Sequence, residues 1–131
     1  MKKQSILAVA LTALIVTGSA FAAKTTATPG YRIFNQSRGT NVATYTTSNP
    51  TGCTGVTFPT PVDSSDNAAL TVTSGFTPGS VCSTQYTSSY TGGTCLVTIS
   101  CDGVSGAVTM YATSIGAPCS AINGNTAVVL Y

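Results

Sequence analysis

The chain has no histidine, no glutamate and no tryptophan, and only 6% of its 131 residues are charged. Histidine and glutamate supply many of the acids and bases that work near neutral pH, so only aspartate is left as an acidic group. No Ser-His-Asp set, glycine-rich phosphate loop or Cys-x-x-Cys pair is present. One run of oxygen ligands, residues 63–67 (DSSDN), is better interpreted as a solvated turn than as a calcium site. We therefore expect no enzyme, no catalytic residues, no cofactor and no metal.

Positive charge is equally scarce, which limits the class of partner. After residue 22 the three basic residues Lys24, Arg32 and Arg38 balance three aspartates, so this part has a formal net charge of zero. Nucleic-acid binding needs clustered lysine or arginine, and the sequence has no such cluster. Repulsion between copies is weak on a neutral surface. We exclude nucleic acid and expect the surface of an unknown protein or glycan as the partner.

Long apolar runs are missing except near the N-terminus. Lys2 and Lys3 precede an apolar run of eleven residues, 6–16, and Ala20-Phe21-Ala22 places small residues where signal peptidase needs them. The run is too short for a membrane-spanning helix, which needs about 20 residues. We predict a bacterial-type signal peptide over residues 1–22, cleaved after Ala22. The protein is then secreted or periplasmic, without stable membrane insertion.

Threonine and serine, by contrast, fill 35 of the 109 positions after residue 22. Threonine suits a pleated strand because it branches at Cβ, and its hydroxyl can face water. Apolar and polar residues alternate in short runs that end at glycine, proline or asparagine, which is typical of half-buried antiparallel strands. The expected strands are residues 31–35, 42–47, 55–58, 68–73, 81–87, 95–101, 107–113 and 126–131.

This spacing of strands predicts an all-β protein with a single antiparallel β-sandwich-like domain of about eight short strands. The domain covers residues 31–131, after a flexible lead over residues 23–30 (AKTTATPG). No sustained helical stripe of apolar residues occurs after residue 22. Because a domain of this size has a modest core, disulfides would add useful stability.

Five cysteines are present, an odd number for a chain expected in an oxidising compartment. The candidates for two disulfides are Cys53, Cys82, Cys95, Cys101 and Cys119. Cys95 and Cys101 lie about 20 Å apart if they share one strand, too far for a bridge. If Gly92-Gly93 is a two-residue hairpin turn, Cys82 lies opposite Gly103 and near Cys101, which favours the pair Cys82–Cys101. Cys95 then pairs with Cys119 or with Cys53, and the spacing leaves both open.

The fifth thiol has three interpretations. It is a buried and inert cysteine, a disulfide that joins two copies in a homodimer, or a reactive nucleophile. The nucleophile is the least favoured because thiolate catalysis needs a nearby base, and the chain has no histidine.

Six tyrosines carry most of the aromatic surface. Tyrosine provides a rigid contact area with an apolar ring and a polar tip, and binding surfaces are enriched in it. Tyr86 and Tyr90 precede Gly92-Gly93, and together these residues are the candidate recognition loop. Alternatively, Tyr86 serves the fold together with Tyr45 and Tyr111, since each of the three is followed by a cysteine at similar spacing.

These features predict an exported, non-enzymatic small β protein that acts by surface contact, as a secreted or periplasmic binding module. The alternative is a structural or adhesive subunit of a surface or fibre. Such a subunit assembles through strand edges or through an intermolecular disulfide of the odd cysteine.

Overall fold

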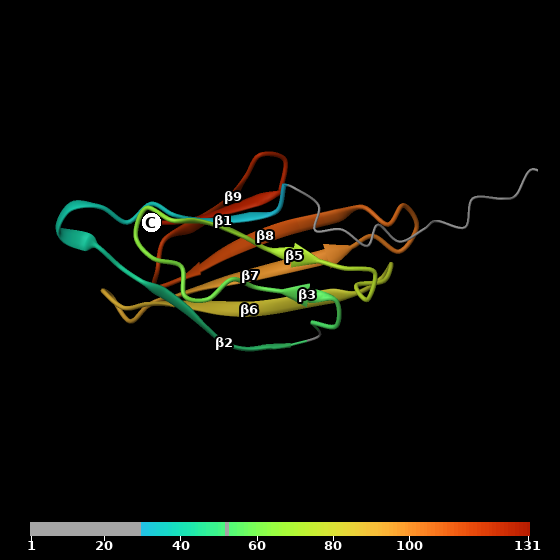
Figure 1. Cartoon of the computed structure of the whole chain (residues 1–131), viewed down its shortest axis with the longest axis horizontal. Coiled ribbons are helices and arrows are strands. Elements are labelled where there is room, and N and C mark those ends of the chain that lie inside the picture. Colours follow the sequence, from blue (N-terminus) through green and yellow to red (C-terminus); the bar gives the residue numbers. More distant parts are fainter. Residues whose placement is uncertain (1–29, 52) are drawn as a thin grey trace, which may run out of the picture.

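The computed structural model describes residues 30–51 and 53–131 (Figure 1). The predicted signal peptide, its cleavage after Ala22 and residues 23–29 of the predicted lead lie outside the described residues. The described chain consists mainly of strands, with one turn of 3-10 helix, η1 (Gly39–Asn41). The prediction of an all-β protein is confirmed.

The strands overlap all eight expected runs, with three departures. The strand Tyr45–Thr51 begins three residues and ends four residues after the expected run 42–47. The expected run 68–73 divides in two, because Ala68 pairs with Ile33 in one sheet and Thr71 pairs with Thr57 in another. The segment Cys119–Ile122 forms a strand that the sequence did not predict, since its four residues are too few to show alternation. The described strands are β1 (Arg32–Asn35), β2 (Tyr45–Thr51), β3 (Val56–Thr57), β4 (Asn67–Ala69), β5 (Thr71–Val72), β6 (Val81–Ser88), β7 (Thr94–Cys101), β8 (Val108–Ile115), β9 (Cys119–Ile122) and β10 (Ala127–Leu130).

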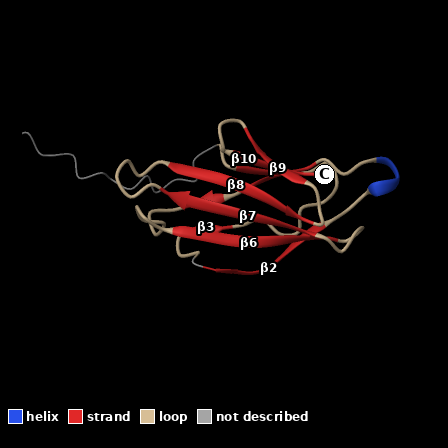
Figure 2. Ribbon diagram, turned by 180° about the vertical axis from the view of Figure 1, so that it is seen from behind, coloured by secondary structure: helices blue, strands red, loops and turns tan. Residues whose placement is uncertain are grey.

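The strands form two four-stranded sheets, in the orders β2-β6-β7-β8 and β4-β1-β10-β9, and a small sheet of β3 and β5. All pairs are antiparallel except β1 with β10, where Ile33 lies opposite Val128 in parallel register. This pair departs from the predicted antiparallel domain. Parallel neighbours need a long connection, and here most of the described chain provides it. In Figure 2, β9 and β10 of the sheet β4-β1-β10-β9 lie above β8 and β7 of the other sheet.

The core draws on all three sheets. Ile33 and Leu130 belong to the same buried cluster as Val97 and Ile99 of β7 and Val72 of β5. Strands β6 and β7 bury every second residue. The residues that alternate with the buried ones, mostly serines and threonines, point outward. The shared cluster is consistent with the sandwich-like packing of the two larger sheets, which stays a prediction.

Two disulfides are present, Cys53–Cys82 and Cys95–Cys119, and the favoured pair Cys82–Cys101 is wrong. The error lies in the register. Thr87 pairs with Thr94, so six residues form the tip of the hairpin and Cys82 lies opposite Ile99 instead of Gly103. Cys101 is the free cysteine, and it is buried.

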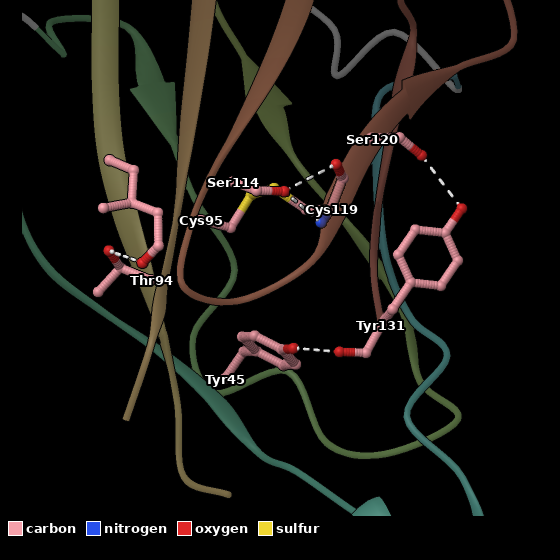
Figure 3. The surroundings of a disulfide bond; sticks show 8 residues. Tyr45, Thr94, Cys95, Ser114, Cys119, Ser120 and Tyr131 are labelled. Carbon is pink, nitrogen blue, oxygen red and sulfur yellow. Dashed lines mark hydrogen bonds between the residues drawn. A yellow bond between two sulfur atoms is a disulfide. The ribbon is translucent and has the colours of Figure 1, made fainter. Parts of the chain in front are cut away.

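The disulfides tie distant parts of the chain together. Cys95–Cys119 joins β7 of one sheet to β9 of the other, with 6.1 Å between the Cα atoms (Figure 3). The two bridges close loops of 24 and 29 residues. Loops of this length each stabilise a fold by about 3.5 kcal/mol, mainly by restricting the unfolded chain.

Candidate contact surface

The tip of the β6–β7 hairpin, residues 88–93, contains most of the predicted recognition loop and is called the hairpin tip below. Ser88 is 2% exposed, and its Oγ accepts hydrogen bonds from the amides of Tyr90 at 3.3 Å and Thr91 at 3.4 Å. The Ser88 amide donates to the Gly93 oxygen and the Gly92 amide to the Ser88 oxygen, both at 2.9 Å. Because one buried hydroxyl satisfies successive amides, the backbone of the tip is held in one conformation.

Contacts to other loops hold the hairpin tip against the body of the domain. The Ser89 amide donates to the Thr44 oxygen at 3.0 Å, and the Thr44 amide donates to Ser89 Oγ at 2.9 Å. The Thr44 hydroxyl in turn donates to Asp63 Oδ1 at 3.0 Å. The tip, the segment before β2 and the loop before β4 therefore meet at one end of the molecule.

The two glycines of the tip have different functions. Gly92 has a φ of +69°, which other residues adopt at a cost, and a Cβ there would enter open space. A Cβ on Gly93, by contrast, would lie 2.2 Å from the carbonyl carbon and oxygen of Gly116. Gly92 is needed for the turn, and Gly93 lets two backbones approach closely.

The two tyrosines of the predicted recognition loop differ in exposure. Tyr90 is 55% exposed, whereas Tyr86 is fully buried and donates from its hydroxyl to the Pro59 oxygen at 2.7 Å. The Tyr86 ring also meets Phe58 edge-on, with 6.4 Å between centroids, and burial raises the pKa of its phenol above the usual value. The expected contact role of Tyr86 is therefore corrected, because its side chain serves the fold.

The three tyrosines with similar sequence surroundings are not equivalent. Tyr45 is 1% exposed and donates to the main-chain oxygen of Tyr131 at 2.6 Å (Figure 3). Tyr111 is 49% exposed on β8. The alternative that all three pack inside the fold thus holds for Tyr45 and Tyr86 only.

A buried asparagine that sequence reasoning missed fixes the loop beside the hairpin tip. Asn35 Nδ2 donates to the oxygens of Ala43 at 2.7 Å and Val62 at 2.9 Å. Its Oδ1 accepts from the Ser37 amide at 3.0 Å and the Ser37 hydroxyl at 2.7 Å. The signal was available, because Asn35 occupies an inward position two residues after Ile33 in the same strand. A polar residue at such a position needs partners in the fold.

The acidic residues bond to neighbouring groups. The amide of Asn67 donates to Asp66 Oδ1 at 2.7 Å, as expected for a turn that caps its own backbone. Asp102 accepts from the amides of Ser105 and Val104 and from the Ser105 hydroxyl, which together lower the pKa of its carboxyl. Among the described residues, no three His, Cys, Asp or Glu side chains gather as a metal would require.

The free thiol of Cys101 is 6% exposed and donates to the Gly106 oxygen at 3.5 Å. Burial, and next the charge of Asp102, raise the pKa of this thiol. A raised pKa leaves less of the reactive thiolate near neutral pH. These properties favour the interpretation of Cys101 as an inert core residue.

The described part of the chain has no helix with the length and hydrophobicity to cross a membrane. Neither a family of known proteins, nor a curated protein, nor a solved structure gives a significant match to the chain. Function must therefore be argued from the surface itself.

Proposed function

We propose that this protein is an exported, non-enzymatic binding module that acts by surface contact through the hairpin tip. The observation that carries the proposal is the half-exposed ring of Tyr90 on a tip whose backbone is fixed by Ser88 and Thr44. A side chain on a fixed loop loses little conformational entropy on binding, so more of the contact energy appears as affinity. Tyrosine suits this role because its ring is large and has few rotamers.

Further features support the proposal. Two disulfides are compatible with export to an oxidising compartment, either outside the cell or in a periplasm. The cluster shared by the sheets supports a sandwich-like body with the tip at one end. Val42, 55% exposed, lies on the loop that Asn35 fixes and Thr44 joins to the tip, and it extends the apolar contact area.

The alternative of a subunit that assembles through strand edges or a disulfide has less support. The amide of Tyr45 on β2 donates to Val62, so a loop covers part of that edge. The free thiol of Cys101 is buried and would have to become exposed before it joined another copy. Size-exclusion chromatography and non-reducing gels test this alternative, and a monomer at high concentration would exclude it.

Two measurements test the proposal. Intact mass of the protein recovered after export should show a chain that begins at Ala23, with two disulfides and one free thiol. Binding of the purified protein to arrays of extracellular proteins and glycans should then identify ligands that Tyr90→Ala loses by about tenfold.

The matched control is Val104→Ala, since Val104 is 99% exposed in the turn at the other end of β7. It should leave binding unchanged. Retention of the leader, or equal binding by wild type and Tyr90→Ala to every array ligand, would disprove the proposal.

A further inference from the structure

The outward side of the sheet β2-β6-β7-β8 has an unusual composition. None of the four strands contains a charged residue. Among the described residues, Arg32 lies on β1, in the other sheet, and the remaining charged residues lie in loops. We call this side the hydroxyl face, and its outward residues on the paired strands are Thr46, Val81, Ser83, Gln85, Thr87, Thr94, Leu96, Thr98, Ser100, Thr109, Tyr111 and Thr113.

Hydrogen bonds connect the hydroxyls across the strands. Ser83 and Thr98 lie 3.0 Å apart on β6 and β7, and Ser100 and Thr109 lie 3.1 Å apart on β7 and β8. The Thr109 hydroxyl also donates to Tyr111 Oη at 3.2 Å. Since a hydroxyl has one proton to donate, Ser100 must donate to Thr109. The resulting chain from Ser100 to Tyr111 leaves the phenol proton free for a ligand, and successive bonds strengthen this donor.

The same contact defines how the Tyr111 ring lies. Thr109 and Tyr111 are two residues apart on one side of β8, which corresponds to about 6.7 Å along a strand. A phenol oxygen can reach the Thr109 hydroxyl only if the ring lies along the strand instead of standing upright. The ring axis then runs along the strand, and the residue is 49% exposed to solvent. Thr98 lies directly opposite Tyr111, so hydroxyl pairs border the ring on adjacent positions.

We propose that the hydroxyl face binds an uncharged polysaccharide, with one sugar ring stacked on Tyr111. A sugar ring presents C–H groups on its faces and hydroxyls at its rim, which match an aromatic ring bordered by hydroxyls. The Ser83–Thr98 pair uses one of its two protons, and the chain from Ser100 to Tyr111 uses two of its three, so each leaves one donor and several acceptors for the ligand. This proposal takes export and contact from the proposed function but uses a different surface.

The composition of the hydroxyl face disfavours charged polymers and proteins as its ligand. A charged polymer would give up hydration on a face that offers no opposite charge. The centre of a protein interface is enriched in large apolar and aromatic residues. The two well-exposed aliphatic residues here, Val81 and Ile115, lie instead at the ends of β6 and β8, and Leu96, within β7, is partly buried.

Binding to defined polysaccharides tests the proposal. The probes are insoluble cellulose and chitin, soluble amylose and β-1,3-glucan as neutral chains, and heparin as a charged chain. We expect retention by at least one neutral probe and none by heparin. Tyr111→Ala should weaken retention by about tenfold, and Tyr111→Phe by less, because it keeps the ring and loses only the donor.

The control variant is Val104→Ala, which removes an exposed side chain from the turn after β7 and should bind the neutral probe like wild type. Unchanged thermal unfolding of Tyr111→Ala would show that its loss of binding is not a loss of fold. The proposal would be overturned if the protein bound none of the four neutral probes, if it bound heparin alone, or if Tyr111→Ala left its binding unchanged. A ligand that depends on Tyr90 and not on Tyr111 would also overturn it, while leaving the proposed function intact.

Discussion

Replacement of Asn35 by alanine tests whether one buried amide fixes the loop beside the hairpin tip. The variant loses four bonds, those from Nδ2 to Ala43 and Val62 and those from the Ser37 amide and hydroxyl to Oδ1. The Ser37 hydroxyl, 3.2 Å from the Ala43 oxygen, can still donate there, and the Val62 oxygen keeps the amide of Tyr45. The uncompensated group is therefore the Ser37 amide, in a residue that is 3% exposed.

The expected loss follows from these bonds. Three net bonds at about 1 kcal/mol each, with the orphaned amide included, give a decrease of about 3 kcal/mol in the free energy of unfolding. For a domain of this size, this corresponds to a fall of roughly 15 °C in Tm. Thermal and urea unfolding followed by circular dichroism would measure the loss, and hydrogen exchange should show faster opening at the Ser37 amide.

Asn67→Ala is the matched control, because Asn67 lies on the neighbouring strand β4 with an exposed side chain that bonds only to Arg32. Its effect should stay within about 0.5 kcal/mol. If Asn35→Ala loses no more stability than Asn67→Ala, the amide does not fix the loop, and the argument that Val42 and the tip are held in place fails.

Three further predictions follow from the hairpins and the free thiol. Gly93→Ala should lose at least 2 kcal/mol because its Cβ meets the Gly116 backbone, whereas Gly92→Ala should lose about 1 kcal/mol from its positive φ; equal losses in urea unfolding would contradict this. Cys101 should resist alkylation at pH 8 in the folded protein and react at once in urea, and rapid native labelling would refute its burial. The lowered pKa of Asp102 means that its carboxylate contributes stability above the ordinary aspartate pKa of about 3.9, and this contribution is lost as pH falls through the lower folded value. Asp102→Asn should therefore have a lower Tm than wild type near neutral pH and approach it in acid; a difference that persists unchanged in acid would contradict this.

The sequence predicted the strands well where alternation was long enough to read. Strands β6 and β7 match the expected runs to within one residue because each buries every second residue over eight positions, whereas β8 ends two residues beyond the expected run 107–113. The short β9 was not predicted. The division of residues 68–73 was not predicted either, because the strand with which each segment pairs depends on the tertiary structure. The parallel pair of β1 and β10 likewise depends on how distant segments meet.

The disulfide error has a specific physical origin. Gly-Gly commonly forms a two-residue turn, so Gly92-Gly93 was assigned to the turn of the hairpin. Only Gly92 has a positive φ, and Gly93 is required by its contact with Gly116, which is distant along the chain. A glycine that serves packing cannot be distinguished in one sequence from a glycine that serves a turn. The resulting four-residue difference in register moved Cys82 from Gly103 to Ile99 and changed the predicted bridge.

The same register decides which tyrosine can meet a ligand. Tyr86 lies opposite the buried Cys95, and Tyr111 lies opposite Thr98 on the outer side of the sheet. Since side chains alternate between the two sides of a strand, a shift of one residue would exchange their environments. The sequence around both tyrosines is similar, so local composition indicated aromatic contact without indicating its side. The candidate sites therefore follow from pairing between strands, and tests at Tyr90 and Tyr111 examine two surfaces that a single sequence could not separate.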